Sequence, residues 1–322
     1  MAIATIRNAL LAIVAALSLV ACGGAGGGGV ASIPAPPVAP TQTPPPPPPS
    51  TSTTPANYMI AANTGDQTFS SKGGYVSYNP ATGQPLSPTT TQGEQLQVRY
   101  NSGSNQYEIM LPSSSFWEGL YRNPQGSTGI DFRTSGTNTA NSPTFVQLQA
   151  YGGTGYTYSA LALWGISSTQ AGISGTAAFG IPTPVGSVPV TGSATYNGSI
   201  SGRSTETSYD MLAAGYWPAI VEGGIGLSFN FAAGTLSGSI SPTIYNLERR
   251  ALAPMTFVNT VYSTGATSFS GSFNTTLTGS NSFAGQFTGP QAQELIGSFQ
   301  FPYTSPDDGK IYQANGAFVG KQ

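Results

Sequence analysis

The chain has 322 residues, with 10 Lys and Arg against 12 Asp and Glu, which gives a formal net charge of -2. Charged residues make up 7% of the chain, far below the usual share of about a quarter, and no basic run offers a surface to nucleic acid. The absence of histidine excludes Ser-His and Cys-His nucleophile pairs, imidazole metal sites and an imidazole haem ligand. The chain also has a single cysteine, so we predict neither a metal nor a cofactor.

Residues 1–21 have the features of a lipoprotein signal peptide. Arg7 supplies a positive start, and an apolar run of signal length extends from Leu10 to Val20. Small residues come directly before Cys22, which resembles the lipobox of bacterial lipoproteins. Cys22 is therefore the predicted lipidation site, where acyl chains such as palmitate hold the mature protein on a membrane. A buried structural cysteine is the alternative, but the flanking glycines offer no core.

Residues 22–56 are predicted to form a disordered tether. Glycines dominate from Gly23 to Gly29, and prolines dominate from Pro34 to Pro55. This composition is typical of a flexible joint followed by a stiff polyproline spacer. At ~3.1 Å per residue in that form, such a tether reaches on the order of 100 Å from the lipid. Gly23 itself resembles the second residue of lipoproteins that are sent to the outer membrane.

The rest of the chain alternates apolar and polar residues over short runs, which is the pattern of an all-β protein. A change in this pattern between Trp164 and Pro184 places a domain boundary near Gly175. We therefore expect an antiparallel β domain over 57–174 and a second β domain over 175–322. The strands expected in the first domain are Gly74–Tyr78, Leu96–Tyr100, Tyr107–Leu111, Gly129–Arg133, Phe145–Tyr151 and Tyr156–Trp164.

Aromatic residues recur at every second position in the second domain. Phe229 and Phe231, Phe269 and Phe273, and Phe283 and Phe287 each share one face of an expected strand, with glycines among them. Such faces suit a closed or strongly curved sheet, in which glycine relieves crowding at bends. We predict that these aromatic side chains form its core.

Two passages and the last strand carry a resemblance to a known family. The residues that carry it are Phe179, Gly180, Thr183 and Pro184, then Gly285, Phe287, Gly289, Pro290, Ala292, Glu294, Gly297 and Phe299, and finally Phe318. Together they resemble the C-terminal β-barrel domain of transferrin-binding protein B and related surface lipoproteins. The resemblance covers about 175–322 and implies an eight-stranded antiparallel barrel, preceded by a handle-like β domain over 57–174. The chain has room for one such pair.

The same motif residues have a structural interpretation that needs no ligand. Gly289 and Pro290 can form a turn, and Gln291 to Leu295 can form one helical turn that caps a barrel end. Glu294 can then accept hydrogen bonds from backbone donors. In two places the sequence departs from the family pattern, because Thr288 replaces an aromatic residue and Val319 is inserted in the last strand. We interpret the motif as the mark of a fold, not of a site.

Two aromatic stretches are the candidate binding loops. They concentrate the residue types that anchor protein interfaces, in a chain otherwise covered by small polar groups. The alternative is that these side chains fill a seam between the two domains. The candidate residues are Phe116, Trp117 and Tyr121 in the first stretch, and Tyr209, Tyr216 and Trp217 in the second.

Acidic residues offer two further candidate sites. The sequence Asp307-Asp308-Gly309 predicts a hairpin turn in preference to a calcium loop, because the other oxygen ligands of such a loop are missing. A pair of carboxylates for glycosidase-type chemistry is the second candidate. The available residues are Asp131, Asp210, Glu206 and Glu222. No spacing joins them, and we predict that the protein is not an enzyme.

The resemblance implies a lipid-anchored protein on the surface of the outer membrane. Such a protein captures an extracellular protein, or a carrier of iron or another solute, and passes it to a TonB-dependent outer-membrane receptor. The alternative is a structural or envelope-associated lipoprotein without a role in uptake. A transmembrane barrel is disfavoured because glycines dilute the apolar faces.

Overall fold

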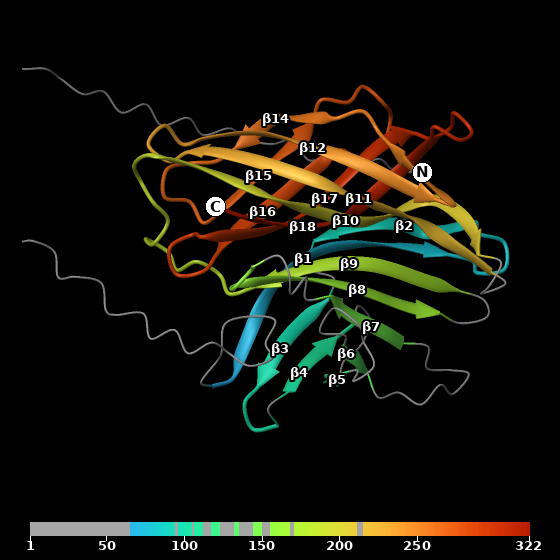
Figure 1. Ribbon diagram of the computed structural model, residues 1–322, viewed down its shortest axis with the longest axis horizontal. Coiled ribbons are helices and arrows are strands. Elements are labelled where there is room, and N and C mark those ends of the chain that lie inside the picture. Colours follow the sequence, from blue (N-terminus) through green and yellow to red (C-terminus); the bar gives the residue numbers. More distant parts are fainter. Residues whose placement is uncertain are drawn as a thin grey trace, which may run out of the picture. The chain divides into compact units, whose positions relative to one another are not determined.

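The computed structural model describes residues 65–93, 96–104, 106–111, 117–122, 132–134, 144–149, 155–167, 171–210 and 215–322. The predicted signal peptide, the predicted lipidation site Cys22 and the predicted tether lie outside these ranges. The described residues form two antiparallel β-sheets (Figure 1). This agrees with the predicted all-β class. In these ranges there is no helix that is long and apolar enough to cross a membrane.

The first sheet corresponds to the predicted handle. Its strands follow the order β6-β5-β4-β3-β1-β9-β8-β7, and β2 pairs with β1 beside this path. The strands are β1 (Gln67–Tyr78), β2 (Pro85–Gly93), β3 (Gln97–Asn101), β4 (Gln106–Met110), β5 (Glu118–Arg122), β6 (Phe132–Thr134), β7 (Thr144–Gln149), β8 (Ser159–Ser167) and β9 (Gly172–Gly180). Strand β1 joins the two halves of this sheet, because its start pairs with β3 and the remainder pairs with β9.

The handle has its own apolar core. Alternate residues of β3 and β4 point into it, among them Val98 and Ile109, which are fully buried. Phe179 of β9 meets Phe69 of β1 edge to face, with ring centroids 5.7 Å apart. Trp164 of β8 is also fully buried in this core. The period-two pattern therefore buries one face of β3 and β4, as expected for an antiparallel sheet.

The second sheet is a closed barrel. It contains β10 (Ser193–Asp210), β11 (Gly215–Asn230), β12 (Thr235–Asn246), β13 (Glu248–Ala251), β14 (Met255–Val261), β15 (Ser268–Phe273), β16 (Ser282–Thr288), β17 (Glu294–Thr304) and β18 (Ile311–Lys321). Strand β18 pairs with β10 and closes the ring, whereas β13 pairs only with β12. Leaving β13 aside, eight strands form the ring, so the predicted eight-stranded antiparallel barrel is confirmed. In Figure 1 these strands run from yellow to red.

Aromatic side chains fill the barrel interior. Phe229 packs against Phe269 and Phe287, with ring centroids 5.1 and 4.8 Å apart respectively. Glycines lie beneath several of these rings: a Cβ on Gly297 would collide with Phe318, and one on Gly285 would collide with Phe269. The alternation of aromatic residue and glycine in the sequence therefore lets each ring lie flat over the neighbouring strand of a strongly curved sheet.

Strands β9, β17 and β18 are buried on both faces. Their second faces form a small core between the handle and the outer wall of the barrel, made of Leu161, Ala178, Ile296, Ala317 and Val319. Thr176 of β9 donates its hydroxyl to the carbonyl of Ser201 in β10 at 2.8 Å. Asn315 of β18 donates its Nδ2 to the carbonyl of Tyr75 in β1, also at 2.8 Å. The handle thus packs directly against β10, β17 and β18.

The change from one sheet to the other lies later than the sequence suggested. Gly175 falls inside β9, and every residue of that strand pairs with both β1 and β8. The first sheet therefore ends at Gly180, and the barrel begins at Ser193. The boundary was hard to place because β9, buried on both faces, lacks the alternation that marks the other strands.

Candidate functional site

The two family-like passages meet in space. Thr183, from the first passage, donates its backbone N–H to the carbonyl of Phe287 at 3.0 Å. Its hydroxyl donates to the carbonyl of Gly289 at 2.8 Å. Gly289 in turn donates its N–H to the carbonyl of Ile181 at 2.9 Å. These bonds fasten the segment that connects the two sheets to the turn between β16 and β17.

Glu294 extends this junction into the handle. The Glu294 side chain is buried and accepts the backbone N–H groups of Thr157 and Tyr158 at 2.6 and 2.9 Å. Burial raises the pKa of the Glu294 carboxyl, although both backbone hydrogen bonds act in the opposite direction. The predicted role as an acceptor of backbone donors is confirmed. The donors belong to the handle, so Glu294 ties the two domains together.

The predicted helical turn over Gln291–Leu295 is wrong. The chain forms a tight non-helical turn there, with Ala292 at a φ of 59° and Gly289 at a φ of 83°. Ala292 keeps this unusual conformation because it is fully buried and its carbonyl accepts the hydroxyl of Tyr196 at 2.5 Å. The turn therefore closes this end of the barrel through a side-chain hydrogen bond.

The other motif residues have structural positions. Phe179 lies in the handle core and Gly180 ends β9. The aromatic and glycine residues of the second passage and of the last strand are buried in the barrel wall or interior, namely Gly285, Phe287, Gly297, Phe299 and Phe318. Pro184 and Pro290 are exposed in turns. The motif residues therefore have structural positions, and Thr183, Gly289 and Glu294 build a junction between handle and barrel that the sequence did not predict.

The aromatic candidates divide between the seam and the handle. Trp217 packs against Tyr78 of the handle, with ring centroids 6.0 Å apart, and the N–H of Tyr216 donates to the carbonyl of Pro80. These two residues thus lie at the seam, as the alternative interpretation predicted. Trp117 lies in the handle under the guanidinium of Arg99, at 4.3 Å from its ring centroid. Phe116 and the side chains of Tyr121 and Tyr209 lie outside the described residues.

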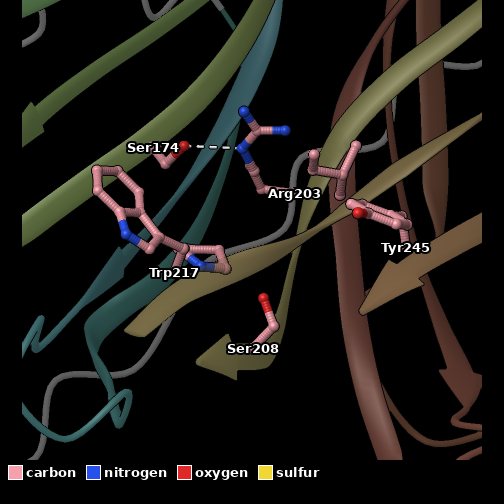
Figure 2. Close-up of a pocket in the computed structure, with 7 residues that line it drawn as sticks. Ser174, Arg203, Ser208, Trp217 and Tyr245 are labelled. Atoms are coloured by element: carbon pink, nitrogen blue, oxygen red, sulfur yellow. Dashed lines mark hydrogen bonds between the residues drawn. The ribbon is translucent and has the colours of Figure 1, made fainter. Parts of the chain in front are cut away.

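A cavity of about 230 Å³ opens beside Trp217. It lies between β9 of the handle and the outer face of β10, β11 and β12, and its lining residues are Ser174, Arg203, Ser208, Trp217, Pro218, Ile220 and Tyr245. Figure 2 shows the Arg203 guanidinium turned toward Ser174, with Trp217 and Tyr245 on either side of it in this view. Four of the seven lining residues are aromatic or apolar, and one cation is placed among them.

Arg203 is held in place by neutral acceptors. Its Nε donates to the hydroxyl of Ser174 at 2.7 Å, and its Nη1 donates to the carbonyl of Gly202 at 3.2 Å. Burial lowers the pKa of Arg203 to about 10, so the guanidinium stays protonated at neutral pH. Sequence reasoning missed Arg203 because its surroundings come from four successive strands, β9 to β12, whose pairing and packing bring separate residues together. Its nearest signal was an isolated cation in a long polar strand.

The opposite end of the barrel from the junction exposes apolar side chains. Tyr245, Leu247 and Ile311 are 42, 73 and 52% exposed. Beside them, Arg250 of β13 pairs with Asp307 of the hairpin between β17 and β18 at 3.4 Å. These three exposed residues are called the loop-end patch below. Sequence reasoning missed this patch, because single apolar residues next to turns give no pattern.

Beneath the loop-end patch, a buried carboxylate lies inside the barrel. Glu206 accepts hydrogen bonds from the amide of Asn246 and the hydroxyl of Tyr303, each at 2.7 Å, and from the hydroxyl of Ser305 at 3.0 Å. Burial is the main cause that raises the pKa of Tyr303 far above its ordinary range. This network fills the barrel end with satisfied polar groups.

The remaining acidic candidates do not converge on one site. Asp308 accepts its bonds locally within the turn between β17 and β18, where Gly309 has a φ of 71°, so the predicted hairpin is confirmed. Glu222 lies on the outer barrel face and pairs with Arg249 at 2.8 Å, away from the interior position of Glu206. Asp131 and the side chain of Asp210 lie outside the described residues. The part of the chain that the structure describes holds no group of three potential metal ligands.

One family model matches the barrel. Residues 188–322 match the family described as the C-lobe and N-lobe beta barrels of Tf-binding protein B. A comparison with curated proteins gave no match. The matched residues include all strands of the closed barrel.

Three solved structures are similar to the chain. A double mutant of the vaccine antigen transferrin-binding protein B from Haemophilus parasuis Hp5 is 12% identical, with a TM-score of 0.36, over 81% of this chain and 76% of that chain. A protein described as a surface lipoprotein is 15% identical, with a TM-score of 0.35, over 76% of this chain and 98% of that chain. Isotype 1 transferrin-binding protein B from serogroup B Neisseria meningitidis is 11% identical, with a TM-score of 0.29, over 80% of this chain and 76% of that chain.

Proposed function

We propose, on the premise that residues 188–322 belong to the family of transferrin-binding protein B barrels, that the protein is a surface-displayed binding protein. Cys22 carries the lipid that anchors it in the outer membrane, and the tether over 22–56 holds the handle and barrel away from the lipid. The protein captures an extracellular protein, or a carrier of iron or another solute. It passes this cargo to a TonB-dependent outer-membrane receptor, and no catalytic step is involved.

The observation that carries this proposal is the match of the barrel to this family. The interior of the barrel is filled by side chains. Rings such as Phe229 and Phe287 occupy the centre of the barrel, so a cargo has to bind from outside. The loop-end patch offers exposed apolar and aromatic side chains next to charged ones. Exposed loops with apolar anchors and a polar rim are the usual composition of a protein-binding surface.

Display is tested by protease shaving of intact cells. We expect the protein to be cleaved while the outer membrane is intact, and a Cys22→Ala variant to be lost from the membrane fraction. A periplasmic protein of the same cells is the control for membrane integrity. Cleavage that occurs only after permeabilisation would refute surface display.

Capture is tested by growth and by binding. A deletion strain is grown under iron limitation with holo-transferrin as the only iron source, and binding of labelled holo-transferrin to intact cells is measured in parallel. We expect growth and binding to return with the wild-type chain and to be reduced when Leu247 and Ile311 are both changed to Ser, with Val261→Ser as the exposed control. Normal uptake with a detergent-sensitive envelope in the deletion strain would favour the structural alternative.

A further inference from the structure

We propose that the cavity at Arg203 is a binding site for a small aromatic carboxylate. This site shares Tyr245 with the loop-end patch, but it concerns a small molecule in place of a protein cargo. The proposal rests on three features of the described residues: an arginine with unused donors, a wall of aromatic and apolar side chains, and a volume that suits one ring.

The guanidinium of Arg203 has donors to spare. Two of its five N–H groups bind Ser174 and the carbonyl of Gly202. Among the described residues no acceptor takes the other three, and no carboxylate lies within 4.0 Å of this cation. The nearest acidic side chain along β11, Glu222, is paired with Arg249 instead. A partly desolvated cation without a counter-ion is costly, and an anion that enters the cavity removes that cost.

The geometry of the free donors favours a carboxylate. Nε donates to Ser174 and one hydrogen of Nη1 donates to Gly202, so the second hydrogen of Nη1 and both hydrogens of Nη2 are left for a ligand. Two parallel N–H groups of a guanidinium match the two oxygens of a planar carboxylate. Phosphate is a poorer match, since Arg203 is the only cation among the described residues that line the cavity and a dianion would keep an uncompensated charge there.

The remaining walls favour an aromatic ring. Trp217 and Tyr245 are aromatic residues of the lining, and Pro218 and Ile220 add apolar surface. An engineered protein cavity of about 150 Å³ is known to bind benzene, and the cavity at Arg203 measures about 230 Å³. One ring with one carboxylate therefore fits. Ser208 supplies a hydroxyl on the same wall, as Figure 2 shows.

Benzoate is a suitable probe, and benzamide is its neutral control. Binding to the full chain in detergent is measured by calorimetry and by saturation-transfer NMR. We expect saturable benzoate binding that is at least tenfold tighter than benzamide binding, because only benzoate carries the charge. Equal affinity for the two probes, or no benzoate binding at millimolar concentration, would overturn the proposal.

Three variants test the location. Arg203→Lys keeps the charge but loses the fork, so benzoate affinity should fall about tenfold or more. Ser208→Leu fills the cavity without changing Arg203, and it should also abolish binding. Ser208→Leu keeps the test valid if the Arg203 variant fails to fold.

Arg249→Gln is the control variant. It removes an exposed cation of the same barrel face and should leave the affinity for benzoate unchanged. Unaltered benzoate binding in Ser208→Leu, with the fold intact by circular dichroism, would refute the site. The benzoate test does not depend on the growth and holo-transferrin binding tests above, so a failure of protein capture there would leave the benzoate result unchanged.

Discussion

Replacing Glu294 by Gln should loosen the junction between handle and barrel. The carboxylate of Glu294 accepts the N–H groups of Thr157 and Tyr158 at 2.6 and 2.9 Å. An amide of the same shape offers only one oxygen, so one of the two donors faces an NH2 group instead. A donor that is buried without an acceptor costs about 1–3 kcal/mol. We therefore expect Glu294→Gln to lower the free energy of unfolding by about that amount.

The effect of Glu294→Gln should also depend on pH. Burial raises the pKa of the Glu294 carboxyl in the folded state, so the folded protein holds this proton more tightly than the unfolded chain. Stability from such a group is complete below the unfolded pKa and is lost as the pH rises through the folded pKa. Because the variant has no proton to lose at this position, the difference between wild type and Glu294→Gln should shrink as the pH rises through that window.

Hydrogen exchange at two amides is the most direct assay for this variant. A loss of about 1–3 kcal/mol corresponds to roughly 5- to 150-fold faster exchange through local opening at Thr157 and Tyr158. Urea unfolding gives the global value. Glu222→Gln is the matched control, since Glu222 forms a partly exposed ion pair with Arg249 that is worth about 0–1 kcal/mol. If both variants leave the exchange of Thr157 and Tyr158 unchanged, Glu294 does not hold the junction.

Three further predictions concern the barrel. Gly297→Ala should cost about 1–3 kcal/mol, because the added Cβ collides with Phe318, and Phe318→Leu in the same chain should recover part of it in a double-mutant cycle. Phe287→Ala should cost about 3–5 kcal/mol by urea unfolding, whereas the exposed Val261→Ala should stay within about 0.5 kcal/mol. Burial raises the pKa of Tyr196 to about 12, so the free energy of unfolding should fall as the pH rises through that value. The ultraviolet absorbance of tyrosinate reports the ionisation itself. Unchanged unfolding free energies, or ionisation of Tyr196 without loss of stability, would contradict these expectations.

The barrel could be predicted from the sequence because its strands keep one face inside. Leu227 and Phe229 on β11 are buried and alternate with the polar residues Ser228 and Asn230, and Phe283 and Phe287 are buried on β16. Strand β9 lacks this signal, since Ala177 packs in the handle core and Ala178 packs toward the barrel. This strand lies between two cores and is buried along nearly its whole length, so its sequence Gly-Ile-Ser-Gly-Thr-Ala-Ala-Phe-Gly shows no alternation of apolar and polar residues. For this reason the domain boundary was displaced into β9.

The parts of the candidate sites that escaped prediction depend on long-range contacts. The acceptor role of Glu294 could be predicted from its place after a turn, but its donors lie 136 and 137 residues earlier in the chain. Likewise, the cavity at Arg203 draws Ser174 from the handle and Trp217 from the barrel. Pattern reasoning found Trp217 as an unusual aromatic residue and could not supply its neighbours.

Contacts between handle and barrel continue along β9 and β10 up to the cavity at Arg203. The hydroxyl of Thr176 in β9 donates to the carbonyl of Ser201 in β10. Two residues away on each strand, the hydroxyl of Ser174 accepts a hydrogen bond from Nε of Arg203. Next to this last contact, Trp217 packs against Tyr78 of the handle. A ligand held by Arg203 therefore touches residues of both domains. Because a ligand that binds only the folded state adds to its stability, occupancy of the cavity would strengthen the same seam that Glu294 fastens at the other end of the barrel.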